Sequence, residues 1–157
     1  MTGVIDPAGA TRGTHLLASS DYVLRAPRQR VWDLLASTII QCMPVEQMEI
    51  VDDSTFKALL KVRIAFVEIP FQIRVRATEI DPIASLGTSV SVSKGGMRFS
   101  IKVWYFLSQI DEDSTAVAST ASLEGSSGLM WLLRNQQRKF ARQMFEAIRE
   151  NLERNCS

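Results

Sequence analysis

Few side chains of this sequence are suited to acid–base, nucleophilic or metal chemistry. His15 is the only histidine and lies close to the N-terminal segment, so a Ser-His-Asp or Cys-His arrangement would have to depend on it. The two cysteines, Cys42 and Cys156, have neither the spacing of metal ligands nor that of a disulfide framework. We therefore expect no metal, no other cofactor and no catalytic residue, and we favour a protein that is not an enzyme.

The paired carboxylates and the adjacent glycines also have simpler explanations than catalysis. Asp52-Asp53 and Asp111-to-Asp113 occur in contexts that are typical of turns, where aspartate side chains accept hydrogen bonds from the local backbone. Gly95-Gly96 lies between two alternating segments and is typical of a turn between strands, because a phosphate-binding loop would open a helix. The chemistry of this chain must therefore come from its shape and its surface.

The length and composition are those of one ordinary globular domain. The chain has 157 residues, of which 46% are hydrophobic and 22% charged, and its net charge of +1 gives no general attraction to nucleic acid. No apolar run approaches the roughly 18 residues of a membrane-spanning helix, and the start of the chain lacks the order of a signal peptide. We expect a cytoplasmic protein with a flexible tail over residues 1–13 and a single domain over residues 14–157.

The first structured elements are predicted to be a strand and a helical pair. Residues 15–25 alternate in polarity toward their end, which indicates a strand. Pro27 is well placed in the first turn of a helix, where its missing N–H costs nothing. A second short helix is expected over Ser37–Cys42, ending before Pro44.

The rest of the chain predicts a sheet followed by one long helix. After Pro44, several short segments alternate with a period of two and are joined by tight turns, which is typical of an antiparallel meander. From Leu129 to Leu152, apolar residues recur at steps of three and four, with Ser126 or Ser127 as the expected N-cap. The predicted fold is α+β and helix-grip: a curved antiparallel sheet of about six to seven strands around the C-terminal helix, with two short helices after the first strand.

Several motifs in this order resemble those of a known superfamily. They are Tyr22-Val-Leu-Arg-Ala-Pro27 running into Val31-Trp32, Cys42-Met43-Pro44, the turn from Asp111 to Thr115, and Glu124-Gly125 before the last helix. The chain resembles the START/Bet v 1-like (SRPBCC) superfamily and, within it, the CoxG-like group, which is named for a component of carbon monoxide dehydrogenase, although Val45 stands where that pattern commonly has glycine. The resemblance implies a cavity between sheet and C-terminal helix for lipids, quinones or aromatic products. It also implies a role beside molybdenum-containing CO dehydrogenase-type enzymes, tied to membrane attachment or lipid-soluble cofactors.

Two segments with small side chains bear on the presence of that cavity. Thr88–Ser93 and Thr115–Ser122 consist mainly of Ser, Thr, Ala and Val and are expected to face large helical residues. Because protein interiors pack at a density near about 0.75, the space is closed by the helix moving in or is filled by a ligand. Composition alone favours the first outcome, and the resemblance favours the second. The side chains predicted to line the cavity are Phe56, Leu60, Val75, Phe99, Ile101, Val103, Tyr105, Val117, Ser119, Phe140 and Met144.

Two further function classes remain open beside a carrier of hydrophobic molecules. A polyketide cyclase or aromatase on the same fold would need an acid–base residue in the cavity, and Tyr105 is the only candidate. In a carrier, the same hydroxyl would meet a polar group of the ligand. A structural docking protein would instead use its outer surface and keep only a vestigial cavity.

The outer surface carries the second predicted feature, which we call the basic face. It consists of Lys57, Lys61, Arg63, Arg74, Arg76 and Lys102, which share the outward parity of their strands. Side chains of neighbouring strands lie within about 5 Å of one another, so this face is either solvated surface or a contact for an anionic membrane or an acidic protein. Peripheral contact with the inner face of the membrane is therefore an open alternative. Trp104 and Phe106 share the outward parity and suggest a contact such as a homodimer, unless a bulge reverses them.

Overall fold

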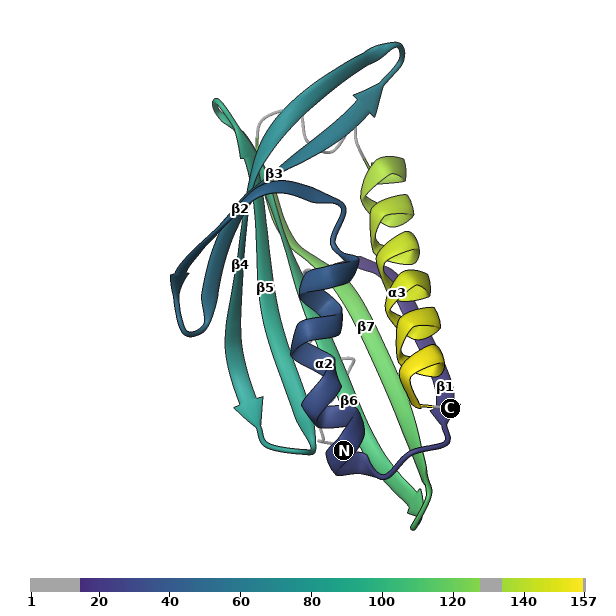
Figure 1. Cartoon of the computed structure of the whole chain (residues 1–157). Coiled ribbons are helices and arrows are strands. Elements are labelled where there is room, and N and C mark those ends of the chain that lie inside the picture. Colours follow the sequence, from purple (N-terminus) through teal and green to yellow (C-terminus); the bar gives the residue numbers. More distant parts are fainter. Residues whose placement is uncertain (1–14, 128–133, 157) are drawn as a thin grey trace.

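Seven strands and two helices make up the part of the chain that the structure, a computed structural model, describes: residues 15–127 and 134–156 (Figure 1). The strands are β1 (His15–Leu24), β2 (Val45–Asp52), β3 (Thr55–Ile64), β4 (Val67–Asp81), β5 (Ser85–Lys94), β6 (Met97–Asp111) and β7 (Ser114–Ser127). The helices are α2 (Arg28–Cys42) and α3 (Arg134–Cys156). All strand pairs are antiparallel, in the order β1-β7-β6-β5-β4-β3-β2. The predicted α+β helix-grip fold is confirmed.

A single helix, α2, takes the place of the two short helices that the sequence predicted. The carbonyl of Pro27 accepts hydrogen bonds from the N–H groups of Arg30 and Val31 at 3.0 and 3.2 Å and so starts the helix. No glycine or proline follows until Pro44, so nothing ends the helix at Ser37. The prediction of a break was wrong because the buried stripe, formed by Val31, Leu35, Thr38 and Ile39, continues through it.

The inner face of the sheet follows the alternation seen in the sequence. Along β3 and β4 the inward pairs are Phe56 with Val75, Ala58 with Ile73, and Leu60 with Phe71, and all six side chains are buried. The outward residues between these pairs, Lys57 and Leu59 on β3 and Gln72 and Arg74 on β4, are exposed or partly exposed. A one-residue slip would reverse every one of these side chains, so the apolar pattern fixes the register.

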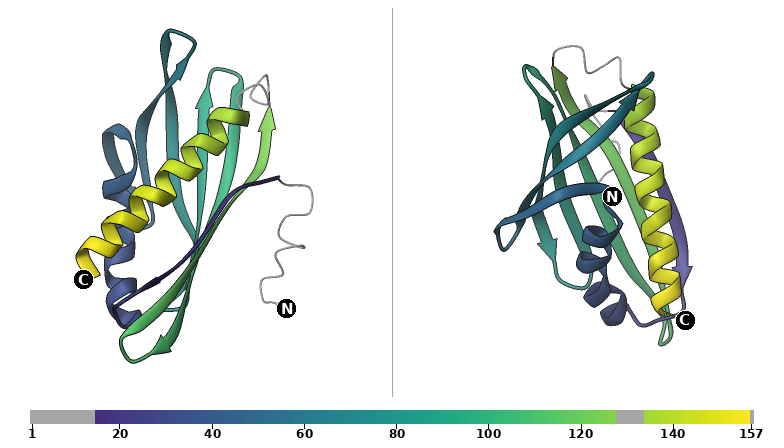
Figure 2. Two further views of the ribbon diagram at one scale, coloured as in Figure 1. Left: turned by 90° about the vertical axis from the view of Figure 1, so that its right-hand side faces the viewer. Right: turned by 45° about the horizontal axis from the view of Figure 1, so that its top comes forward.

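The helix α3 lies obliquely across the inner face of the sheet, with α2 beside it (Figures 1 and 2). Its buried stripe includes Phe145, Ile148 and Leu152. Ser126 and Ser127, the expected N-cap, are the last residues of β7, opposite Phe99 and Arg98. The predicted helix start at Leu129 and the predicted tail over residues 1–13 lie outside the described residues.

Candidate functional site

An apolar pocket of about 350 Å³ opens between α2 and the part of the sheet that contains β3, β4 and β5. We call it the α2 pocket. Its walls include Trp32, Leu35 and Ile39 from the helix and Phe56, Val75 and Leu86 from the sheet. The helical residues follow one another at steps of three and four, so they share one face of α2. That face covers the sheet only in part, which leaves the pocket open.

A second pocket, also of about 350 Å³, lies between the N-terminal half of α3 and the strands β3, β4 and β6. We call it the α3 pocket. The sheet contributes Leu60, Phe71 and Phe99, and the helix contributes Gln136 and Phe140. The sheet residues form an apolar floor, and the walls include polar side chains because the exposed side of α3 forms part of the opening.

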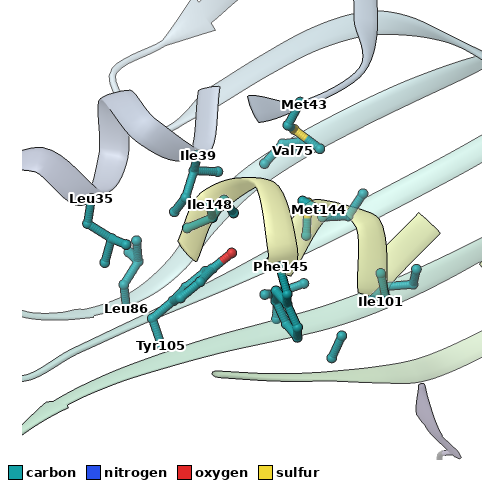
Figure 3. Packing of buried hydrophobic residues seen from close by; sticks show 14 of the residues in the cluster. Leu35, Ile39, Met43, Val75, Leu86, Ile101, Tyr105, Met144, Phe145 and Ile148 are labelled. Atoms are coloured by element: carbon teal, nitrogen blue, oxygen red, sulfur yellow. The ribbon is translucent and has the colours of Figure 1, made fainter. Parts of the chain in front are cut away.

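The two pockets lie close to each other along the same pair of strands. The pair Phe56–Val75 belongs to the α2 pocket and the pair Leu60–Phe71 to the α3 pocket, with only Ala58–Ile73 between them. The two bordering pairs are four residues apart along each strand, which corresponds to about 13 Å. Pro44 lines the α3 pocket, and Figure 3 shows the buried side chain of its neighbour Met43 directed toward Val75. The Met43–Pro44 segment therefore separates the two pockets.

The structure divides the predicted lining residues into three groups. Phe56 and Val75 line the α2 pocket, and Leu60, Phe99 and Phe140 line the α3 pocket. The others are buried but line neither of these two pockets: Ile101, Val103, Tyr105, Val117, Ser119 and Met144. In this third group the helix has packed onto the sheet, as the contact of the Tyr105 and Phe145 rings at 6.0 Å between centroids shows.

Sequence reasoning missed the residues that α2 contributes to its pocket, namely Trp32, Leu35 and Ile39. Their helical spacing was visible, but nothing in the sequence indicated that α2 would cover the β3–β5 part of the sheet. The covering role was assigned to the C-terminal helix alone. A helix placed before a meander of this length has to bury its apolar stripe somewhere, and that requirement could have pointed to the missing wall.

The hydroxyl of Tyr105 is one of two polar groups of the predicted site that are buried in the described core, the other being the hydroxyl of Ser119. The Tyr105 hydroxyl is fully buried and has no hydrogen-bond partner among the described residues. Figure 3 shows it directed toward Ile39 of α2 and Ile148 of α3. Burial raises the pKa of Tyr105, so the group remains a neutral hydroxyl. It can exchange a hydrogen bond with a ligand but cannot act as a base near neutral pH.

The remaining titratable groups near the α2 pocket have local structural roles. At the rim, Asp52 Oδ1 accepts hydrogen bonds from the Ser54 N–H at 2.9 Å and from the Ser54 hydroxyl at 3.2 Å. The backbone bond, followed by a bond from the Thr55 side chain and then by that from the Ser54 hydroxyl, lowers the pKa of Asp52. Burial raises the pKa of both thiols, Cys42 and Cys156, which makes them poor nucleophiles. In residues 15–127 and 134–156, no three His, Cys, Asp or Glu side chains gather as metal ligands.

Three of the six cations of the basic face are paired with carboxylates. Lys61 lies 3.0 Å from Glu46, Arg63 lies 3.8 Å from Glu68, and Lys102 lies 3.4 Å from Glu79 (nitrogen to oxygen). The other three are Lys57, Arg74 and Arg76.

The centre of the basic face is hollow. Lys57 and Arg74 are directly opposite each other on β3 and β4 and border a groove of about 860 Å³ on the outer side of the sheet. Ser91 and Ser100 lie in the same groove, and Arg98 contributes a further cation. Small hydroxyl residues on β5 and β6 thus keep the middle of the basic face lower than its charged borders.

Trp104 and Phe106 do face outward, as their parity predicted, but they are half-buried and pack on each other. Their rings stack with centroids 5.6 Å apart, and the Lys102 ammonium lies 4.9 Å from the Trp104 centroid. A Cβ atom on Gly87 would lie 2.8 Å from the Trp104 ring, so this position has room only for glycine. The pair is a local cluster that covers the sheet itself.

The strand order, the two covering helices and the apolar pockets on the inner face define a helix-grip protein of the START/Bet v 1-like (SRPBCC) class. Within that class, the family model of CoxG, the G component of carbon monoxide dehydrogenase, matches residues 22–157, and the chain belongs to this family. Both levels of the resemblance seen in the sequence are thereby confirmed. No curated protein matches the chain in sequence.

Solved structures with the same fold are similar over nearly their whole length. A conserved protein from Geobacillus kaustophilus is 18% identical, with a TM-score of 0.67 over 88% of this chain and 96% of its own. A START superfamily protein from Mycobacterium smegmatis is 14% identical, with a TM-score of 0.59 over 90% and 97%. An aromatase/cyclase from Streptomyces is 15% identical, with a TM-score of 0.56 over 92% and 96%. At these identities the similarity establishes the fold.

Neither α2 nor the described part of α3 is long and apolar enough to cross a membrane.

Proposed function

We propose that this protein binds a hydrophobic small molecule, such as a lipid, a quinone or an aromatic compound, on the inner face of its sheet. The observation that carries the proposal is the α2 pocket, because aromatic and aliphatic side chains form most of its walls. Its volume of about 350 Å³ falls in the usual range for small-molecule sites, roughly 300–1,000 Å³. The CoxG family and the START-type fold support the same class of function.

Binding without chemical change is the better supported form of this function. An aromatase/cyclase shares the fold, but such chemistry would need an acid or base in contact with the ligand. Of the candidates, burial raises the pKa of Tyr105, which makes it a weak acid and no base near neutral pH, and Asp52 is held by hydrogen bonds in its turn. The hydroxyl of Tyr105 is suited to orient a bound molecule.

A substitution at the mouth of the α2 pocket tests the proposal. Ala36 lines the pocket from an exposed position of α2, and Ser37 is the exposed neighbour that does not line it. Ala36→Trp should fill the mouth and weaken the binding of an apolar fluorescent probe at least about tenfold, which corresponds to about 1.4 kcal/mol. Ser37→Trp is the matched control and should leave the binding unchanged.

Two outcomes would count against the carrier function. Equal probe binding by Ala36→Trp and the wild type would show that the α2 pocket is not the site. Native mass spectrometry of the purified protein should also reveal a copurified lipid, quinone or aromatic molecule. Conversion of that molecule by the purified protein would favour the enzymatic alternative.

We further propose that the protein acts as an accessory to a CO dehydrogenase-type molybdenum enzyme and that the groove in the basic face receives an acidic segment of its partner. The groove is concave and lined by three cations, Lys57, Arg74 and Arg98, against one carboxylate, Glu49, which suits a narrow acidic segment better than a flat membrane. Arg74→Glu together with Arg76→Glu should abolish capture of the partner enzyme at low salt. Probe binding should persist in this variant, because the two faces of a strand are separate.

A further inference from the structure

Strands β3 and β4 continue beyond their neighbours as a two-stranded ribbon. The pairing of β2 with β3 ends at Leu60, and the pairing of β5 with β4 ends at Gln72, so residues 61–70 pair only with one another. In Figures 1 and 2 the ribbon projects at the end of the molecule where the described part of α3 begins. An isolated two-stranded ribbon is at best marginally stable in water, so its extension contributes little to the fold.

The tip of the ribbon departs twice from the usual chemistry of a turn. Ala65 has φ of 57°, in the left-handed region that favours glycine or asparagine. Phe66 follows it with 97% of its surface exposed, and Val67 is 59% exposed. The Phe66 side chain is therefore not stabilised by burial against other described residues. Departures from local rules without structural gain are concentrated at functional sites.

Basic side chains predominate on the elements beside the tip. Lys61 and Arg63 lie on the ribbon, where they are paired with Glu46 and Glu68, and they help to line the α3 pocket together with Lys139. From Arg134 to Phe145, α3 carries four basic residues and no acidic one. The β6–β7 turn at the other end of the sheet is instead acidic, with Asp111, Glu112 and Asp113. The apolar tip therefore lies at the end of the sheet beside the basic stretch of α3 and away from the acidic turn (Figure 1).

We propose that the ribbon tip, Ala65–Val67, inserts into the interface of an anionic lipid surface, with the surrounding basic residues against the headgroups. The two apolar side chains are far too few for a stable protein interface, which buries about 1,200–2,000 Å². An exposed aromatic residue backed by cations is instead the pattern of interfacial membrane binding. Docked in this way, the opening of the α3 pocket faces the lipid. The use of that opening for ligand exchange rests on the proposed carrier function, whereas the docking itself does not.

Vesicle sedimentation tests the docking. The wild type should bind vesicles of phosphatidylglycerol and phosphatidylcholine in equal parts more tightly than vesicles of phosphatidylcholine alone, and the difference should shrink in high salt. Phe66→Ser should weaken binding to the anionic vesicles at least about tenfold, and Phe66→Trp should retain it. The matched control is Ile110→Ser on β6, because Ile110 is 55% exposed and lies next to the acidic turn. This variant should bind as the wild type does.

Each other result overturns the proposal in a defined way. If Phe66→Ser binds the vesicles like the wild type, the tip does not contact lipid. If Ile110→Ser loses binding to the same extent, the contact is not specific to the ribbon. Equal binding to neutral and anionic vesicles would remove the role of the basic residues. Apolar-probe binding measured on the same variants separates the two proposals, because loss of docking with intact probe binding leaves the carrier function standing.

Discussion

The inner face of the sheet has a filled half and an open half. Over β1, β7 and the C-terminal part of β6 the helices close onto the sheet: α3 packs on β1, α2 on β6 and β7, and the ring of Phe145 meets that of Tyr105. Tyr105, Val117 and Phe145 are all buried. Over β3, β4 and β5, two pockets of about 350 Å³ each remain. The filled half contains the small residues of β7, whereas the open half contains large residues such as Phe56 and Phe71.

This difference shows what determines the position of empty space. Small side chains on β7, such as Ser119 and Ala121, are buried and line neither pocket, so the volume they release is filled by the covering side chains. Space remains where the covering helices end or diverge, whatever the size of the residues beneath. Strand composition therefore indicates how close a helix can come, and helix placement decides where a ligand fits.

The largest expected effect compares two phenylalanines of the same helix. Phe145→Ala removes a ring from the filled half and should lower the free energy of unfolding by about 3–5 kcal/mol. Phe140→Ala removes a partly buried ring that lines the α3 pocket, and its cost should be less than half as large. Chemical denaturation of both variants gives the comparison. Equal losses would mean that the open half is as tightly packed as the filled one.

A smaller effect is expected at Tyr105, where the filled half contains an unpartnered hydroxyl. Tyr105→Phe removes that hydroxyl and should raise the free energy of unfolding of the ligand-free protein by about 1 kcal/mol. The same change should weaken binding of any ligand that forms a hydrogen bond with the group. Thermal denaturation with and without the copurified ligand separates the two effects. A destabilised ligand-free variant would show that the hydroxyl is already satisfied within the protein.

The smallest effect on stability is expected at the edge of the open half. Ile80 lines the α2 pocket and is 58% exposed, so Ile80→Ser should change the free energy of unfolding by no more than about 0.5 kcal/mol. Binding of an apolar probe should nevertheless weaken by roughly fivefold, because part of its apolar contact is lost. Fluorescence titration beside Ile110→Ser provides the measurement and its control. A large loss of stability at Ile80 would contradict the openness of this half.

The sequence was sufficient for the fold because alternation, turns and helical spacing are local properties. Strands β3, β4 and β6 lie where their period of two predicted, with the expected residues inward. The placement of α2 over the sheet is a tertiary property, and it escaped prediction together with Trp32 and Ile39. The ion pairs of Lys61 and Lys102 with Glu46 and Glu79 depend on the strand pairing, so parity alone overstated the charge of the basic face.

One residue pair, Ala58–Ile73, is all that lies between the two pockets on β3 and β4. If the protein carries a hydrophobic ligand, this spacing makes the occupancy of one or both pockets depend on the length of the ligand. The pairs that border the two pockets are about 13 Å apart, so an apolar group much shorter than this fits within one pocket, whereas a longer one has to reach past Met43 into the other. Methionine has three rotatable bonds and a polarizable sulfur, so its side chain can turn aside without moving the backbone. The position of the Met43 side chain would therefore decide whether a long flexible ligand can occupy both pockets, whereas a short rigid ligand would occupy only one.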